Sequence, residues 1–181
     1  MGRLTEGSII NIKNKSHAVT SEVMVPETGA EGVIIAQGGL TGGWSLYVKE
    51  GKPKYCYNFY GIERYYVEGT SRIPAGKHQV RMEFAYDGGG LAKGGTVTLY
   101  IDGAKCGEGR VEKTEPMVFS ADETCDVGFE AGSPVTYDYG KRGTKFSGDV
   151  SWVEIDLGKD AINLDHLITA EDRLRLAMAR Q

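Results

Sequence analysis

The sequence has no long apolar run, no excess of positive charge and few cysteines. No stretch approaches the ~20 consecutive apolar residues that a membrane-spanning helix needs, so we expect no membrane partner. The formal net charge of −4 argues against a nucleic-acid partner, because a nucleic-acid binder usually carries a basic stripe. Residues 1–15 also lack the apolar segment of an export signal. We therefore expect a cytoplasmic chain, or a periplasmic one if the sequence is a piece of a longer exported protein.

Cysteine and histidine are too sparse and too scattered to indicate a metal or redox site. The three cysteines, Cys56, Cys106 and Cys125, contain no C-x-x-C pair and cannot all pair internally. We expect buried or half-buried thiols on strands, with no disulfide framework. The histidines share no motif, and we expect surface or packing roles for them. They are His17, His78 and His166.

Several acidic residues lie beside glycine turns or close together in the sequence. We interpret them as solvated turn carboxylates, with a structural calcium site as the alternative. We expect no cofactor and no catalytic metal in this chain. The acids in question are Asp87, Asp102, Asp122, Glu123 and Asp126.

Glycine is abundant, and its spacing predicts many short strands. The 26 glycines among 181 residues are about twice the usual share. Two alternating runs, residues 44–49 and 55–60, are joined by a short loop with Gly51, which is typical of an antiparallel hairpin. Large side chains stand on both faces of the second run. This favours a strand in the middle of the sandwich, or one whose outer face meets something else.

The other strands follow from the same alternation. Residues 77–87 alternate most cleanly, with Val80, Met82 and Phe84 directed inward. A slip of one residue would expose these groups at a cost of ~1.5–3 kcal/mol each. Further strands are expected at residues 17–25, 32–37, 63–68, 96–101, 105–111, 116–120, 125–130 and 146–157.

Two loops stand out among the connections. The glycine loop at residues 87–95 fails the spacing of phosphate-binding motifs and precedes a strand, so we interpret it as a hairpin connection. Residues 131–145 are expected to form a long polar loop that carries Tyr137, Asp138 and Tyr139.

The period of the pattern changes after residue 157. Residues 158–181 place apolar side chains at helical spacing, and Thr169-Ala-Glu-Asp172 has the form of a capping box. We therefore expect a β-sandwich domain over residues 1–157 and a helical tail over residues 158–181. The predicted fold class is all-β, an antiparallel jelly-roll sandwich with one C-terminal α-helix. Such a fold leaves the function open.

Three long motifs resemble the C-terminal part of long bacterial arylsulfatases. They are AQGGLTGGWSLYVKEGKPKYCYNFYGIERY at residues 36–65, IPAGKHQVRMEFAYDGGGLAKGGTVTLYIDG at 73–103 and FSADETCDVGFEAGSPVTYDY at 119–139. The final strand, FSGDVSWVEIDL, fits the same pattern. The resemblance implies a concanavalin A-like or laminin-G-like sandwich that follows a catalytic domain in a sulfuric ester hydrolase. The three cysteines and the extension after Leu157 depart from the family pattern.

The chemistry of that family is missing from this chain. Sulfatases use a formylglycine made from Cys or Ser in C/S-x-P-x-R, beside a divalent metal that the resemblance gives as calcium. The run Cys106-Gly-Glu-Gly-Arg110 imitates the motif, but Glu108 stands where proline is needed. The resemblance therefore implies a non-catalytic domain that packs on a catalytic sulfatase domain and rims its substrate cleft. The tail helix offers another copy of the chain as a second possible partner.

Two other functions stay open on the residues alone. The first is a carbohydrate-binding module, in which exposed aromatic rings stack on sugars while polar groups bind hydroxyls or a sulfate. The second is a hydrolase that uses a carboxylate pair assembled by the fold. The candidate ligand-binding residues are Trp44, Asn58, Tyr60, Arg64, Tyr65 and Tyr139.

Overall fold

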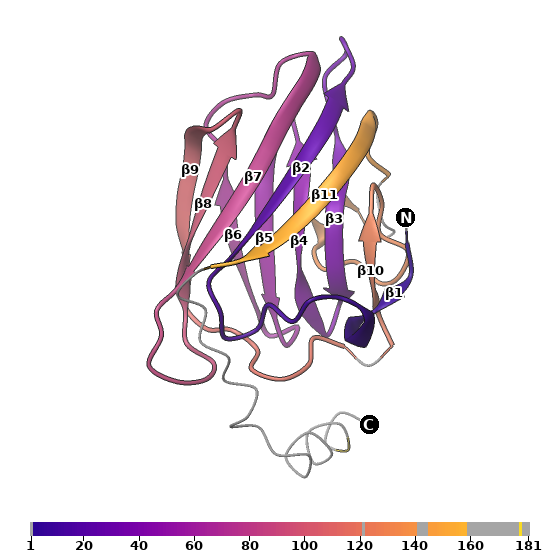
Figure 1. Ribbon diagram of the computed structural model, residues 1–181. Helices are drawn as coiled ribbons and strands as arrows, with labels where there is room; N and C mark the ends of the chain where they lie inside the picture. The colour runs from indigo at the N-terminus through magenta and orange to yellow at the C-terminus, as the bar shows by residue number, and fades with distance from the viewer. Residues whose placement is uncertain (1, 121, 141–144, 159–177, 179–181) are drawn as a thin grey trace.

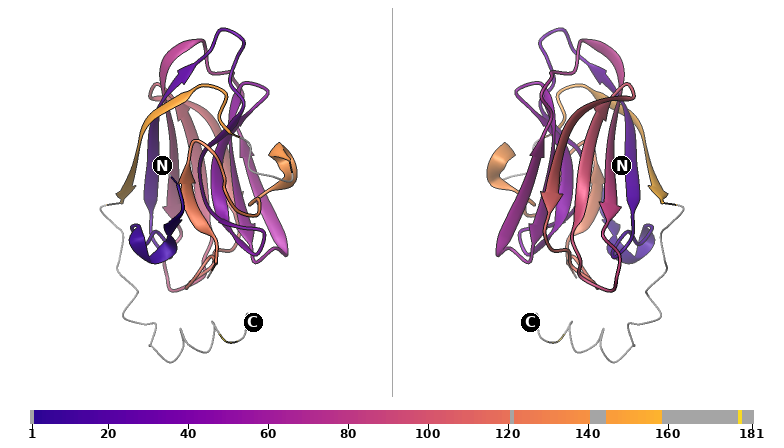
Figure 2. Two further views of the ribbon diagram at one scale, coloured as in Figure 1. Left: turned by 90° about the vertical axis from the view of Figure 1, so that its right-hand side faces the viewer. Right: turned by 90° about the vertical axis from the view of Figure 1, so that its left-hand side faces the viewer.

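The computed structural model describes residues 2–120, 122–140, 145–158 and 178, and these form a sandwich of two antiparallel sheets (Figure 1). Sheet A has the strand order β1 (Leu4–Thr5), β10 (Thr124–Val127), β3 (Gly32–Gly39), β4 (Gly42–Lys49), β5 (Lys52–Phe59) and β6 (Glu63–Glu68). Sheet B has the order β11 (Asp149–Leu157), β2 (His17–Val25), β7 (Gly76–Tyr86), β8 (Gly95–Ile101) and β9 (Ala104–Val111). Edge-on views show the two layers face to face (Figure 2). The predicted antiparallel sandwich is confirmed.

The alternation in the sequence located most strands closely. Strands β2 and β6 have the predicted bounds, and β4 pairs with β5 as the predicted hairpin. The hairpin turns at Glu50 and Gly51, whose φ angles of 54° and 77° suit the twist of a tight two-residue turn. The glycine loop at 87–95 connects β7 to β8, as expected.

One interface between the sheets forms the main core. From sheet B, Val80, Met82 and Phe84 of β7 point inward as predicted. From sheet A, Trp44 and Leu46 of β4 meet them, and both are fully buried. Burial of such side chains at ~1.5–3 kcal/mol each fixes the register of both sheets.

The predicted strand at 116–120 is wrong. This segment follows β9 and crosses toward the start of the chain without pairing in either sheet. The backbone N–H groups of Phe119 and Ser120 donate to a carboxylate oxygen of Glu6, at 2.9 and 3.3 Å, and the carbonyl of Pro116 accepts from Asn14 Nδ2 at 2.8 Å. Side chains from the N-terminal segment therefore satisfy the backbone groups that a strand partner would have satisfied.

Strands near the C-terminal part are shorter than predicted. Strand β10 ends at Val127, because Gly128 turns the chain with φ = 80°. Strand β11 begins at Asp149, and its register with β2 shifts between Val150 and Trp152, as in a β-bulge.

One hairpin requires glycine for a close approach of two strands. Gly38 of β3 and Gly43 of β4 face each other with φ angles of 88° and 142°. A Cβ atom on Gly43 would lie 2.1 Å from the carbonyl oxygen of Gln37. The glycine pairs that the sequence places around Leu40 and Thr41 thus allow the strands to approach without side chains between them.

The predicted helical tail and His166 lie outside the described residues. Among the described residues, no helix has the length and apolar character that a membrane crossing requires.

Candidate functional site

The outer face of sheet A is partly covered by residues 129–140, here called the cover segment. Figure 2 shows the short 3-10 helix η2 (Tyr137–Tyr139) of this segment lying outside sheet A. Beneath the segment, Tyr47 and Cys56 form a second apolar cluster with Val135. The long polar loop predicted at 131–145 is therefore packed on the sheet along its first half. The second run of the hairpin, residues 55–60, meets this segment at Cys56, in line with the second of the two interpretations of its large side chains.

Asp138 fastens the cover segment to the sheet. Its carboxylate accepts a hydrogen bond from Tyr47 Oη at 2.6 Å, pairs with Lys54 Nζ at 2.7 Å and also pairs with Lys49. Burial alone would raise the pKa of Asp138, but these three donors lower it to about 2. Asp138 is therefore charged at neutral pH, and it connects β4 and β5 to the segment above them.

Glu130 links residues within the cover segment itself. Its carboxylate is buried and accepts hydrogen bonds from Tyr139 Oη at 2.6 Å and from the Val135 N–H at 2.9 Å. The ring of Tyr139 packs edge-on against Tyr47, with the centroids 4.9 Å apart. Burial raises the pKa of Glu130 to about 7, although both hydrogen bonds act in the opposite direction.

At the margin where the cover segment meets β6, an aromatic and cationic patch remains partly exposed. Arg64 and Tyr66 stand two residues apart on the outer face of β6, and Tyr137 reaches them from the cover segment. The ring of Tyr137 is 54% exposed and lies 5.8 Å from the guanidinium carbon of Arg64, and Tyr66 is 48% exposed. Lys54 lies 6.0 Å from the centre of the Tyr66 ring. We call Arg64, Tyr66, Tyr137 and Lys54 the β6 patch.

Hydrogen bonds hold the β6 patch in a fixed geometry. Arg64 Nε donates to the carbonyl of Val135 at 3.0 Å, and Tyr66 Oη lies 2.8 Å from Thr136 Oγ1. Among the described residues, the two Nη groups of Arg64 have no hydrogen-bond partner. The patch thus presents two aromatic surfaces and a pre-oriented guanidinium group, which can stack on a ring and bind an anion.

Charge around the β6 patch favours anions. Within the β6 patch as defined, both charged side chains, Lys54 and Arg64, are cationic. Lys54 pairs with Asp138 and Glu68, whereas no ion pair joins Arg64 to a carboxylate among the described residues. Glu68 pairs with both Lys52 and Lys54, at 3.4 and 3.3 Å. Burial would lower the pKa of Lys54, but Asp138 and Glu68 raise it, so this ammonium group keeps its charge.

Three of the predicted ligand-binding residues are buried. Trp44 lies in the main core, and its indole N–H donates to Gln37 Oε1 at 3.0 Å. Tyr65 points into the same core and donates to Glu63. Asn58 is fully buried, and its amide donates to the carbonyls of Gly39 and Leu40 and accepts from the Gly61 N–H. In this structure their rings and amides are not presented to a ligand.

The other three predicted residues are distributed between the patch and its supports. Arg64 belongs to the β6 patch, whereas Tyr139 lies beneath the cover segment against Tyr47. Tyr60 is half-buried at the turn after β5, with φ = 54°, and packs edge-on against Phe59. The structure therefore does not gather the six predicted residues into one site.

Sequence reasoning missed Tyr66, Tyr137 and Lys54. Strand periodicity contained a signal for the first, because Tyr66 shares a face with Arg64, whereas Tyr65 lies on the opposite face. No local pattern places Tyr137 above β6, since that contact joins segments 71 residues apart, as in the Arg64–Val135 hydrogen bond.

The candidate metal and thiol residues have structural partners. Asp126 is buried and accepts hydrogen bonds from the backbone N–H groups of Arg3 and Ala131, so its interpretation as a solvated turn residue is wrong. Glu123 accepts from Ser133. Within the described ranges, no three His, Cys, Asp or Glu residues are grouped to hold a metal ion.

The three cysteines are free and buried on strands, as predicted. Burial raises the pKa of Cys56 and of Cys125 to about 12, and it also raises the pKa of Cys106. All three are therefore thiols at neutral pH. Cys106, the residue that imitates the sulfatase motif, lies in β9 with its side chain in the main core.

Two described histidines have packing or surface roles, as predicted. His17 is buried against Phe84, and burial lowers its pKa to about 4. His78 is hydrogen-bonded to Asp102, which raises its pKa.

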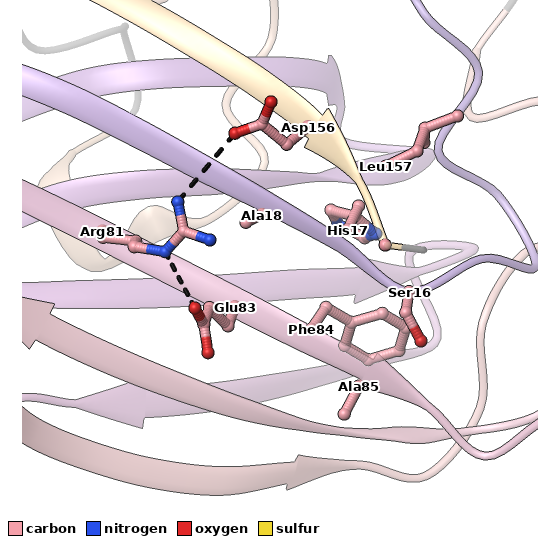
Figure 3. A pocket seen from close by; sticks show the side chains of 10 residues that line it. Ser16, His17, Ala18, Arg81, Glu83, Phe84, Ala85, Asp156 and Leu157 are labelled. Carbon is pink, nitrogen blue, oxygen red and sulfur yellow. Dashed lines mark hydrogen bonds and ion pairs between the residues drawn. The ribbon is translucent and has the colours of Figure 1, made fainter. Parts of the chain in front are cut away.

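A hollow lies on the outer face of sheet B (Figure 3). It has a volume of about 260 Å³, and Ala18 of β2 and Ala85 of β7 form part of its lining. Arg81 stands between Glu83 and Asp156, with Nε 2.8 Å from Glu83 Oε1 and Nη1 4.0 Å from Asp156 Oδ2. Two carboxylates and one guanidinium make this hollow slightly acidic, unlike the β6 patch.

Comparisons with known proteins show the fold. No protein-family model matches the sequence, and no curated protein matches it either. The solved structure of the mouse laminin α1 chain, domains LG4-5, is similar with a TM-score of 0.59 and 15% identity, over 90% of this chain and 41% of that chain. The CBM40 domain of Ruminococcus gnavus IT-sialidase is similar with a TM-score of 0.54 and 11% identity, over 86% of this chain and 82% of that chain.

The same CBM40 bound to α2,3-sialyllactose is also similar, with a TM-score of 0.53 and 12% identity over 84% of this chain and 80% of that chain. At these identities the likeness concerns the backbone alone. The chain is therefore an antiparallel jelly-roll sandwich of the kind found in laminin-G and carbohydrate-binding domains.

Proposed function

We propose that this chain is a carbohydrate-binding module that binds acidic glycans at the β6 patch. The observation that carries the proposal is the juxtaposition of Arg64 with two exposed tyrosine rings, Tyr66 and Tyr137. Sugar rings bind to proteins by stacking an apolar face on an aromatic ring and by hydrogen bonds from their hydroxyl groups. A carboxylate or sulfate on the sugar would pair with the open Nη groups of Arg64.

Rigidity of the patch supports this role. Arg64 and Tyr66 stand on a strand, and Tyr137 belongs to a segment that Asp138 fastens to the sheet and that Glu130 links within itself. A site that is ordered before binding loses less conformational entropy when the ligand binds. The CBM40 structure with bound sialyllactose, an acidic sugar, adds support from a chain of similar fold.

The test is titration calorimetry with three probes: 3′-sialyllactose, a sulfated lactose and lactose itself. We expect the two acidic sugars to bind more tightly than lactose, and their affinity to fall as salt screens Arg64 and Lys54. Hydrogen bonds to charged groups are worth ~1.5–3 kcal/mol, so Arg64→Gln should weaken binding by about tenfold or more. Tyr137→Ala should also weaken binding, whereas Tyr137→Phe keeps the stacking ring and should not.

Arg110→Gln is the matched control, because Arg110 is an exposed arginine on β9 of the other sheet. Equal loss of binding in this control and in Arg64→Gln would mean that net charge, not the β6 patch, determines binding. Failure of all three probes and of a wider glycan array would rule out the proposal.

We also propose a setting for this module, drawn from its resemblance to the C-terminal part of long bacterial arylsulfatases. In that interpretation, the module would follow a catalytic sulfatase domain and support it, rimming its cleft, and a sulfated glycan would be a natural ligand for the β6 patch. The buried thiol of Cys106 argues that the chemistry would belong to the other domain. Turnover of an aryl sulfate by this chain alone would contradict a non-catalytic role.

A further inference from the structure

The hollow on sheet B has the features of a second ligand site, separate from the β6 patch. It lies on the outer face of the other sheet, where β11, β2 and β7 run side by side. The hollow forms where a small side chain stands between larger ones. Ala18 of β2 pairs with Asp156 of β11 on one side and with Glu83 of β7 on the other. At ~30 Å³ per water molecule, a volume of about 260 Å³ corresponds to about eight waters or one sugar ring.

Polar groups converge in the hollow, and some of their hydrogen-bonding capacity is left open. Arg81 Nε donates a hydrogen bond to Glu83, and Arg81 Nη1 donates one to Thr20 Oγ1 at 2.6 Å. These two bonds orient the guanidinium plane. Its Nη1 stays 4.0 Å from Asp156 Oδ2, longer than a hydrogen bond. Within the described ranges, Asp156 accepts no hydrogen bond, and Arg81 Nη2 donates none. A hydroxyl group placed between them could accept from Arg81 and donate to Asp156 (Figure 3).

Charge selects the class of ligand. One guanidinium faces two carboxylates, those of Glu83 and Asp156, so a carboxylate or sulfate would meet net repulsion. A neutral polyol has the matching groups, since neighbouring hydroxyls can both donate and accept. Ala18, Ala85 and Leu157 supply apolar surface for the C–H groups of such a ligand.

We propose that the hollow on sheet B is a second binding site, which takes a neutral sugar residue through Arg81 and Asp156, while Glu83 orients Arg81. The site is independent of the β6 patch, because it lies on the opposite sheet and has the opposite charge balance. A chain with both sites would contact a neutral and an acidic sugar on its two faces.

The experiment follows the backbone amide NMR signals of the full ¹⁵N-labelled chain during titration with the methyl glycosides of glucose, galactose and mannose. For at least one of them we expect saturable shifts at Ala18, Arg81 and Asp156, with the amides of β6 unchanged. The variant Ala18→Leu fills the hollow and should weaken this binding by about tenfold or more, as expected when a ligand loses its polar contacts.

Ala104→Leu is the control, because it adds the same side chain at an exposed position at the start of β9. If Ala18→Leu does not fold, Asp156→Asn serves instead, since Asp156 is half-exposed and makes no close contact whose loss would unfold the chain. Absence of saturable shifts with all three glycosides would overturn the proposal. So would shifts confined to β6, or equal binding by the hollow-filling variant and its control.

Discussion

The outer faces of the two sheets differ in what lies on them. Along β4 and β5 of sheet A, the cover segment buries Tyr47 and Cys56 in a second apolar cluster. On sheet B, the outer side chains of β7 pair with one another instead, as in Arg81–Glu83, and no described segment packs over them. The same strand alternation thus produces a buried face in one sheet and a solvated face in the other.

This difference shows where binding surface can exist. On sheet A, the described residues include exposed aromatic surface at β6, where Tyr137 of the cover segment brings a second ring beside Tyr66. Sheet B is open, and charged side chains on its outer face pair with neighbours, as Arg81 does with Glu83. Asp156 in the hollow lies 4.0 Å from Arg81. A rigid aromatic site on one face and a polar hollow on the other follow from the presence or absence of a cover.

The largest effect is expected from removing the ring on which the cover segment packs. Tyr47→Ala deletes a fully buried side chain together with its contact to Tyr139 and its hydrogen bond to Asp138. We expect the free energy of unfolding in urea to fall by about 3–5 kcal/mol, the usual cost of such a truncation. Tyr100→Ala is the matched control on the outer face of sheet B, where a half-exposed tyrosine donates to Glu83 at 3.1 Å.

The control variant should lose about 1 kcal/mol or less, the range of a cross-strand pair. Similar losses for Tyr47→Ala and Tyr100→Ala would mean that the cover segment adds no core. The covered face of sheet A and the open face of sheet B would then contribute equally to stability.

Most of the sandwich was predictable from the sequence, and the cover segment was not. Alternation located β2, β6 and β7 closely, because apolar and polar residues alternate along a strand that has one buried face. Large side chains on both faces of residues 55–60 indicated either an interior strand or an outer face that meets something else, and Cys56 lies under the cover segment. Local patterns could not name residues 129–140 as the cover, since its contacts span about 90 residues, as between Lys49 and Asp138.

The same limit explains the errors at the site. The face of a strand on which an aromatic residue stands decides whether it is exposed or buried. Trp44 and Tyr65 were predicted to bind a ligand because they are aromatic, but both lie in the core. The predicted strand at 116–120 failed because its backbone bonds to Glu6, more than 100 residues earlier. Side-chain partners at that separation leave no periodic trace in the sequence.

The next effect is that stability depends on pH in opposite directions at the two sheets. Glu130 under the cover segment has its pKa raised to about 7, so the folded chain keeps a proton that the unfolded chain releases above pH 4.5. Its contribution to stability is therefore present at low pH and is lost as the pH rises toward 7. His17 at the end of sheet B has its pKa lowered to about 4, so its contribution is present above pH 6.5 and is lost as the pH falls.

These two slopes oppose each other between pH 4.5 and 6.5, and each amounts to about 3 kcal/mol. In Glu130→Gln only the His17 titration remains of the two, so we expect the free energy of unfolding to fall as the pH is lowered. In His17→Phe only the Glu130 titration remains, so we expect the free energy of unfolding to rise as the pH is lowered. Urea unfolding at pH 5, 6 and 7 measures both. His78 is present in both variants, so its own titration cancels when they are compared. Parallel slopes in the two variants would contradict the opposed titrations.

A smaller loss is expected from the ionic fastening of the cover segment. Asp138→Asn removes the charge that Lys49 and Lys54 neutralise, and it should lower the free energy of unfolding by about 1.5–3 kcal/mol at pH 7. Because the pKa of Asp138 falls from 3.8 to about 2 on folding, the wild type keeps this contribution above pH 3.8 and loses it as the pH falls from there through 2. Asp156→Asn, whose nearest cation is 4.0 Å away on sheet B, should change stability much less.

The smallest effect is expected at an exposed, bidentate ion pair beside sheet B. Arg110 and Asp87 make a two-pronged contact, with Nη1–Oδ1 at 2.9 Å and Nη2–Oδ2 at 2.7 Å, and both side chains are nearly half exposed. Asp87→Asn should cost less than about 1 kcal/mol, because solvent screens exposed pairs. A double-mutant cycle with Arg110→Gln, repeated in about 1 M salt where screening is nearly complete, measures the coupling. A coupling as large as the loss from Asp138→Asn would mean that the open face is held by charges as firmly as the covered face is held by its segment.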